Sequence, residues 1–197
     1  MGKKVEEVVT AATEVFLRYG YERVKMADIA GAAHMSRPAL YLVFPSKEEI
    51  FTAVLERAFA ANLDEIRQGL SRFKTTEQKL TFAFDVWSVR PFEMILASPD
   101  ARDLYESSFQ FATDVTTKAH ADFVSILAEV LDPLVQHQAK VKLTSVQIAQ
   151  MLARAVPGFK GSAKTTAQLR ELIARLITVV LASLGTLKGP RIVKRNA

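Results

Sequence analysis

Apolar residues recur at three- and four-residue spacing along nearly the whole chain. The first run contains Val5, Val8, Ala12, Phe16 and Tyr19, which share one face of an α-helix. No run of useful length alternates apolar and polar residues, so the pattern argues against a sheet. The pattern therefore predicts an all-α protein. The expected helices are 3–19, 26–33, 37–43, 46–70, 75–96, 99–106, 107–131, 144–156 and 165–187.

Several of these helices begin with a hydroxyl residue followed three positions later by Glu or Gln. In such a pair the hydroxyl caps an amide of the first turn while the later side chain reaches back. The pairs are Ser46/Glu49, Thr75/Gln78, Thr144/Gln147 and Thr165/Gln168. Ser98 followed by Pro99 indicates another start. Gly20 is expected to close the first helix in a left-handed conformation. Helix breaks are expected near Pro91, at Asp132–Pro133 and from Pro157 to Ser162.

Composition narrows the class of protein without naming it. The 197 residues suit one domain, or a small domain joined to a larger one, and cysteine is absent. No apolar segment is long enough to cross a bilayer and none follows the N-terminus as a leader, so we expect a cytoplasmic protein with no membrane contact. The net charge is +5, yet residues 1–60 carry equal numbers of acidic and basic side chains. Charge alone therefore identifies no nucleic-acid site.

The stretch "DIAGAAHMSRPALYLVF", residues 28–44, contains two short helical patterns separated by a turn. Helices of seven or eight residues are not stable alone, so they need the helices before and after them as a base. Ser36 is a good N-cap for the second helix, and Pro38 lies in its first turn. This arrangement is a helix-turn-helix, whose second helix enters the DNA major groove in nucleic-acid-binding proteins. The alternative is an ordinary three-helix corner of a core.

The longer stretch "MADIAGAAHMSRPALYLVFPSKEEIF" resembles the DNA-binding signature of the TetR family of bacterial regulators. The resemblance covers about the first quarter of the chain, and the remainder agrees only as a variable all-helical domain. It implies a helix-turn-helix DNA-binding domain over 1–47 and a ligand-binding and dimerisation domain over 48–197. Two departures are that Lys25 stands where the family has Thr or Ser, and that His34 replaces the turn glycine. His34 is then expected at positive φ.

The resemblance and the chemistry of the side chains assign roles within this signature. Arg37 suits a bidentate bond to guanine, and Ala39 or Leu42 suits contact with a thymine methyl group. The other members would position the DNA backbone, and for Tyr41 the alternative is a core aromatic. The expected DNA-binding residues are Lys25, Ser36, Arg37, Pro38, Ala39, Tyr41, Leu42 and Lys47.

Beyond residue 70 aromatic residues concentrate in the middle third of the chain. A helical core is the default explanation, but the family usually binds a small effector among such residues, and apolar pockets are the usual ligand sites. The expected effector-binding residues are Phe84, Trp87, Phe109 and Phe123. The apolar stripe of the last helix, 165–187, is too wide for a helix that packs on the core with one face and exposes the other face to solvent. With 144–156 it predicts a homodimer interface, and a twofold dimer implies a palindromic operator.

The sequence thus favours a ligand-responsive transcriptional regulator, most often a repressor in this family. Its partners would be a double-stranded DNA operator and a small-molecule effector of unknown identity. An enzyme is disfavoured because His34, His120 and His137 lie in separate segments and no glycine-rich loop or metal-ligand spacing occurs. No cofactor or metal is expected. The alternative is an architectural or partner-binding helical DNA-binding protein without an effector.

Overall fold

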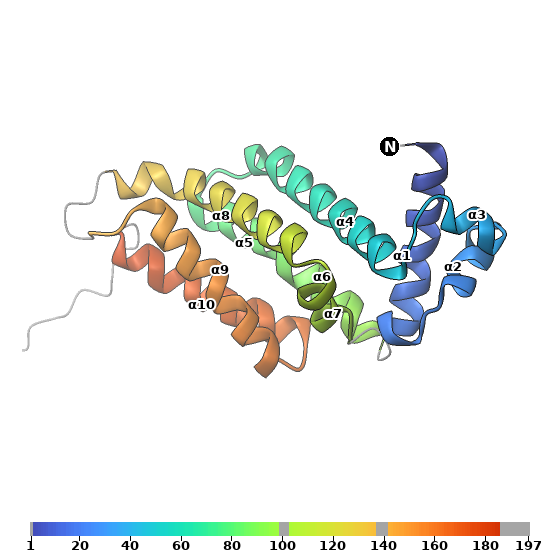
Figure 1. Ribbon diagram of the computed structural model, residues 1–197. Helices are drawn as coiled ribbons and strands as arrows, with labels where there is room; N and C mark the ends of the chain where they lie inside the picture. Colours follow the sequence, from blue (N-terminus) through green and yellow to red (C-terminus); the bar gives the residue numbers. More distant parts are fainter. Residues whose placement is uncertain (1, 99–102, 137–141, 186–197) are drawn as a thin grey trace, which may run out of the picture. The chain divides into compact units, whose positions relative to one another are not determined.

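The computed structural model describes residues 2–98, 103–136 and 142–185, and every regular element in those ranges is helical (Figure 1). The all-α class is therefore confirmed. The start expected at Ser98–Pro99 lies partly outside the described residues. The helices are α1 (Lys3–Arg23), α2 (Met26–Ala32), α3 (Arg37–Tyr41), α4 (Lys47–Gly69), η1 (Leu70–Arg72), α5 (Thr76–Phe84), η2 (Asp85–Val89), α6 (Arg90–Ala97), α7 (Asp103–Phe111), α8 (Thr113–Val135), α9 (Ser145–Ser162) and α10 (Thr166–Ser183).

Residue contacts divide the chain into two compact units. Unit 1 comprises residues 1–65 and 90–122, and unit 2 comprises residues 66–89 and 123–197. The boundaries between the units fall inside α4, between η2 and α6, and inside α8. The functional division at residue 47 concerns DNA and ligand binding, so it stays a prediction.

Unit 1 is built on α1, which packs against both α2 and α7, while α2 packs against α3. Its core includes Phe16, Ile29, Leu40 and Phe51, all at most 1% exposed. Arg57 joins α4 to α1, because its guanidinium donates to the hydroxyls of Thr10 at 2.7 Å and Thr13 at 2.9 Å. The two short helices thus rest on a base of long ones, as their length requires.

Helix α1 contains a kink at Gly20, where φ is 76° and ψ is 173°. The positive φ agrees with the expected role of this glycine, but the ψ value differs from the left-handed helical one and the helix resumes over residues 21–23. This backbone region is accessible essentially to glycine alone. The kink interrupts the helical hydrogen bonds of α1, and Tyr21 begins a new turn.

Unit 2 contains α5, η2, α9 and α10, with α10 packed against both α5 and α9 (Figure 1). Its buried residues include Leu80, Leu127, Leu152 and Ile177, each 0% exposed. Gly69 permits a close approach of the Phe82 ring, because a β-carbon at this position would lie 2.3 Å from a Phe82 ring carbon.

All four expected hydroxyl caps are confirmed. The amide of the residue three positions on donates to Ser46, Thr75, Thr144 and Thr165 at 3.2 Å in each case. The returning side chain completes the box at Thr75 and Thr144, whereas Gln168 accepts from the amide of Lys164 instead of Thr165. Local sequence therefore determines where these helices begin.

The expected helix breaks were less accurate. One helix was expected over 75–96, but α5 and α6 are separated by η2, a π-helical turn. Pro91 has no amide hydrogen, so it cannot complete an α-helical turn, and the chain widens just before it. The expected ends near Pro133 and Pro157 were wrong, since α8 and α9 continue through both prolines. A single lost hydrogen bond is tolerated where helix packing continues. No helix in the described ranges is long and apolar enough to cross a membrane.

Candidate nucleic-acid interface

Helix α3 has one buried side and one side open to solvent. The Ser36 hydroxyl caps it by accepting the amide of Ala39 at 3.3 Å, and Pro38 lies in its first turn. Leu40 is fully buried and anchors the helix to the unit 1 core, and Phe44 is 8% exposed. On the other side Tyr41 is 45% exposed and Leu42 is 90% exposed. Tyr41 is therefore not a core aromatic.

The turn between α2 and α3 depends on His34, whose φ is 53°. This confirms the positive φ expected of a residue in the place of the turn glycine. The amide of His34 donates to Gly31 at 3.1 Å and the amide of Met35 donates to Ala30 at 2.9 Å, so the turn is closed by backbone bonds. Histidine tolerates this conformation better than most residues, although at some cost.

Lys25 precedes α2 at the cap position, where its side chain cannot accept an amide hydrogen. Asp28 compensates from within the helix, because its carboxylate accepts the amide of Lys25 at 2.8 Å. The Lys25 side chain itself is exposed. Half of a capping box is thus sufficient to start α2, and the lysine side chain is not used as a cap.

Lys47 begins α4 and is held by Tyr21. Its Nζ donates to the Tyr21 carbonyl oxygen at 2.9 Å and lies 4.0 Å from the centroid of the Tyr21 ring. This cation–π and hydrogen-bond contact fixes the position of the ammonium group. The phosphate contact expected of Lys47 stays a prediction, and the structure adds a packing role that the sequence did not indicate.

Tyr21 lies at the centre of this region and is 2% exposed. Its ring packs against Phe16, Phe51 and Phe111, with centroids 5.8, 4.7 and 4.9 Å away. Its hydroxyl donates to Glu48 Oε1 at 3.0 Å. Burial, together with this carboxylate, raises the pKa of Tyr21 well above its usual range. The pKa of Glu48 is lowered, mainly by a hydrogen bond from its own amide, with Tyr21 contributing further.

The eight expected DNA-binding residues all belong to unit 1, at the start of α2, along α3 and at the start of α4. The expected effector-binding residues are divided between the units. In unit 2 the Trp87 ring stacks on Phe123 at 4.6 Å, and Phe84 meets Phe123 edge-on at 5.4 Å. Phe109 belongs to α7 in unit 1, and its side chain lies outside the described residues.

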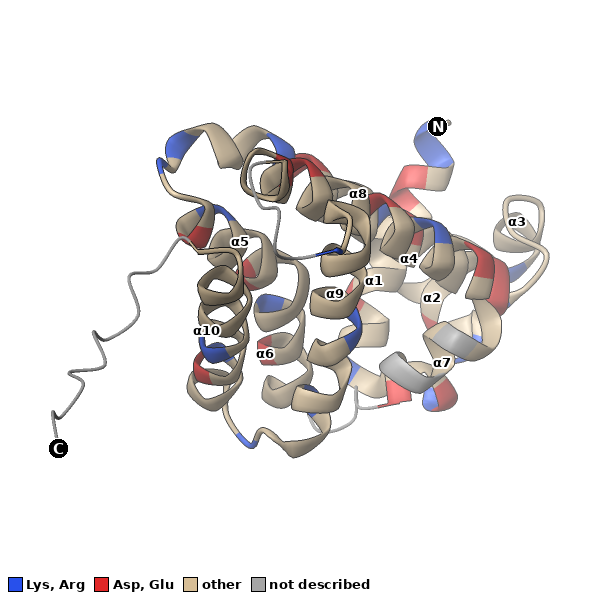
Figure 2. Ribbon diagram, turned by 90° about the vertical axis from the view of Figure 1, so that its left-hand side faces the viewer, with Lys and Arg blue, Asp and Glu red and all other residues tan. Residues whose placement is uncertain are grey.

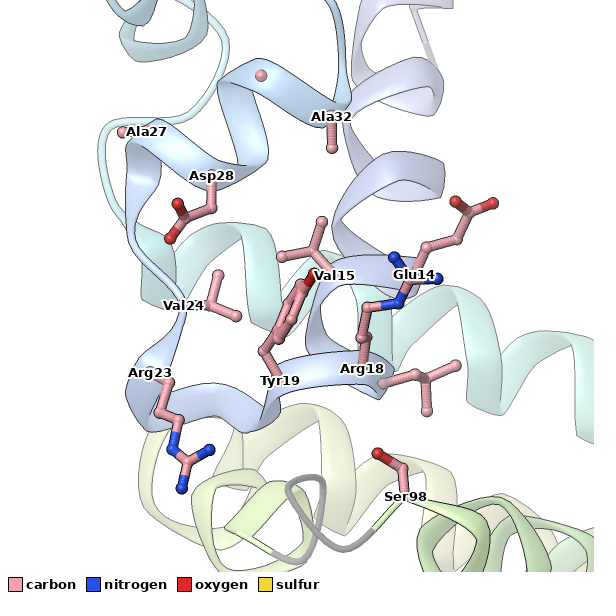
Figure 3. Close-up of a pocket in the computed structure, with 12 residues that line it drawn as sticks. Glu14, Val15, Arg18, Tyr19, Arg23, Val24, Ala27, Asp28, Ala32 and Ser98 are labelled. Carbon is pink, nitrogen blue, oxygen red and sulfur yellow. The ribbon is translucent and has the colours of Figure 1, made fainter.

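A separate hollow of about 1050 Å³ lies between α1 and α2 in unit 1 (Figure 3). Charges of both signs line it, namely Arg18 and Arg23 together with Glu14 and Asp28. None of the four expected effector-binding residues lines this hollow. The mixture of charges gives it no net preference for an anionic ligand.

The fold and the exposed side of α3 define a helix-turn-helix protein. Residues 8–54 match the family model of the bacterial regulatory proteins, tetR family. The transcriptional activator FasR of Mycolicibacterium smegmatis is 36% identical over 81 residues, which cover 41% of this chain and 37% of that activator. The chain thus spans little more than a third of that relative's length.

Solved structures share the fold over most of the chain. A transcriptional regulator from Cytophaga hutchinsonii aligns with a TM-score of 0.75 at 18% identity, covering 92% of this chain and 98% of that one. Thermus thermophilus FadR, a TetR-family repressor solved with lauroyl-CoA, aligns with a TM-score of 0.62 at 21% identity, covering 90% and 93%. At these identities the likeness establishes the fold alone.

Proposed function

We propose that this protein is a transcriptional regulator that binds a palindromic DNA operator as a homodimer and is released from it by a small hydrophobic effector, in the manner of a repressor. The observation that carries the proposal is the open side of α3. It presents Arg37 and the 90%-exposed Leu42 beside a buried Leu40 that holds the helix in place. An exposed, rigidly supported second helix suits insertion into a major groove.

Within this proposal the contacts divide by chemistry. Arg37 reads a guanine edge, and Leu42 or the half-buried Ala39 contacts a thymine methyl group. Lys25, Ser36, Tyr41 and Lys47 hold the phosphate backbone, and Pro38 shapes the first turn of α3. Arg37 is the one Lys or Arg between Lys25 and Lys47. Recognition therefore relies on few charged groups.

The proposed dimer interface is the apolar face of α9 and α10, both in unit 2. Met151 of α9 is 60% exposed and Val179 of α10 is 66% exposed, and exposed apolar residues that form a contiguous patch mark an interaction site. Leu172, Leu176 and Val180 are half-buried on the same helix as Val179. In Figure 2 most of both ribbons is tan, with a few acidic and basic residues on α10 and basic residues on α9. A second copy of the chain would cover this face, as in obligate dimers.

The proposed effector site includes the ring cluster of Phe84, Trp87 and Phe123, in which Trp87 belongs to the π-helical turn η2. These rings pack on one another, so an apolar ligand would have to part them. Local π-helical turns often mark functional sites. The lauroyl-CoA complex of the Thermus thermophilus FadR structure supports an effector with a hydrophobic chain.

The decisive test is binding of the purified protein to DNA from upstream of its own gene at several salt concentrations. Salt-dependent, saturable binding in preference to random DNA is expected. Arg37→Ala should weaken specific binding by about 5- to 150-fold, equivalent to ~1–3 kcal/mol, and weaken binding to random DNA far less. Lys47→Ala should weaken both alike and flatten the salt dependence. Equal losses from Arg37→Ala on both DNAs would refute its role as a base reader.

The effector proposal has its own readout, because Trp87 is the only tryptophan of the chain. A hydrophobic ligand that enters the ring cluster should change its fluorescence and raise the melting temperature in a concentration-dependent way. The Trp87→Phe variant supplies the matched control for the optical signal. DNA binding without a response to any acyl or aromatic compound would favour the architectural alternative. Sedimentation of Val179→Glu, which should yield monomers, tests the dimer.

A further inference from the structure

One carboxylate of α7 bonds to the backbone of α1, in the base of the helix-turn-helix. The Oδ1 atom of Asp103 accepts the amide of Tyr21 at 3.0 Å, and its Oδ2 atom accepts the amide of Glu22 at 2.7 Å. These residues are 82 and 81 positions apart in the sequence, and all of them belong to unit 1. Asp103 is the first residue of α7.

The kink at Gly20 is what makes these two amides available. In an uninterrupted helix they would donate to carbonyl groups four residues earlier. Because Gly20 departs from helical geometry, Tyr21 and Glu22 begin a new turn whose first amides need other acceptors. A carboxylate is well matched to such amides, since charge-assisted hydrogen bonds are short and strong.

The same residue, Tyr21, also contacts the start of α4. Its carbonyl oxygen accepts from Lys47 Nζ, and its hydroxyl donates to Glu48, so it holds the first two residues of that helix. At the far end of α7 the Phe111 ring stacks on Tyr21 with an interplanar angle of 30°. Both ends of α7 therefore contact Tyr21, Asp103 at its backbone amide and Phe111 at its ring.

We propose that Asp103 is a positioning residue for DNA binding, because it fixes Tyr21 and through Tyr21 the start of α4 beside the helix-turn-helix. This inference rests on the proposed DNA-binding function. It identifies α7 as the element whose displacement would alter operator affinity. Asp103 touches no DNA, and its effect is on the placement of groups such as Lys47.

The negative charge of Asp103 allows a positioning role to be distinguished from a purely electrostatic effect on DNA binding. Loss of a negative charge from a DNA-binding unit should, through electrostatics alone, strengthen binding to any DNA. Loss of a positioning contact should instead weaken specific binding while random DNA is bound as before or slightly better. Asp103→Asn keeps a single acceptor oxygen and Asp103→Ala keeps none, so the loss should be graded in that order.

The experiment compares operator and random-DNA affinities of the full chain and these variants. Asp122→Asn is the charge-matched control, because Asp122 lies in unit 1 and forms an exposed i,i+4 pair with Lys118. Asp103→Asn should weaken operator binding at least about fivefold, the lower end of typical coupling between sites. Asp122→Asn should cause no such loss.

Two further measurements keep the proposal testable if Asp103→Ala does not fold. Tyr21→Phe retains the ring packing and removes the hydroxyl bond to Glu48, so it should also reduce operator affinity selectively. Because both changes act through Tyr21, the losses in the double variant should be less than additive. If wild type binds the operator and Asp103→Asn behaves like Asp122→Asn, the positioning role is overturned. If wild type binds no DNA preferentially, the proposed function itself fails.

Discussion

The exposed leucine that follows α3, Leu42, leads to a prediction that can be tested on both the protein and the DNA. Leu42 is 90% exposed, whereas Ala39 is half-buried and its amide is used by the Ser36 cap. Leu42 is therefore the better placed of the two residues for a thymine methyl group, the one apolar feature on a base edge in the major groove. The perturbation is Leu42→Ala, combined with replacement of individual thymines by deoxyuridine, which lacks the methyl group.

The expected magnitude follows from the surface available. Nearly the whole Leu42 side chain is open to solvent, so a methyl contact would be gained in full on binding. Burial of one methyl group contributes about 0.8 kcal/mol, which corresponds to about a fourfold change in affinity. In a dimer with two equivalent half-sites, loss of both contacts should weaken binding by about fifteenfold, or about 1.6 kcal/mol.

The assay is a thermodynamic cycle measured by fluorescence anisotropy at fixed salt. Deoxyuridine at the contacted position should weaken wild-type binding, and Leu42→Ala should weaken binding to the natural operator by a similar factor. The two changes together should cost little more than either alone. Leu96→Ala, at a leucine of α6 that is 40% exposed, is the matched control and should behave as wild type throughout.

The reasoning would be refuted if replacing each thymine by deoxyuridine weakened the binding of wild type and of Leu42→Ala by the same factor. In that case the exposed leucine would not read the base edge. If wild type still bound its operator in preference to random DNA, the proposed function would stand. Sequence specificity would then be assigned to Arg37 or to recognition of DNA shape.

Two further predictions concern stability. His34→Gly should keep or raise the melting temperature, because it removes the cost of a non-glycine residue in the left-handed conformation, roughly 1 kcal/mol. His34→Val should clearly lower the melting temperature, because a β-branched side chain tolerates this conformation less well. Equal melting temperatures for the two variants would contradict the strain at this position. Burial lowers the pKa of Lys160 to about 8 from its ordinary 10.5, so between these values the unfolded chain binds a proton that the folded chain releases. Stability of wild type relative to Lys160→Met should therefore rise with pH across this window in urea titrations, and the exposed Lys164→Met should show no such trend.

Local patterns determined much of this protein. The apolar period predicted an all-helical fold, and the hydroxyl caps marked four helix starts correctly, because both signals act within a few residues. The same holds for the turn at His34, whose backbone has to reverse direction within the short link between α2 and α3. Proline was a weaker guide. A missing amide hydrogen shows where one bond is lost, but the surrounding packing decides whether the helix ends, widens or continues.

Contacts between distant segments were decided only by the tertiary structure. No signal in the sequence relates Asp103 to Tyr21. The sequence identified Lys47 only as a cation at the start of a helix and not as a partner of Tyr21. The exposure of Leu42 and the burial of Leu40 depend on which side of a five-residue helix faces the core, and a helix that short has too few positions to define a stripe. The sequence by itself thus determined the helices and the turn that form the candidate interface. The fold alone determined which side chains are open to DNA and how α7 holds the helices behind them, because those contacts join residues that are far apart in the chain.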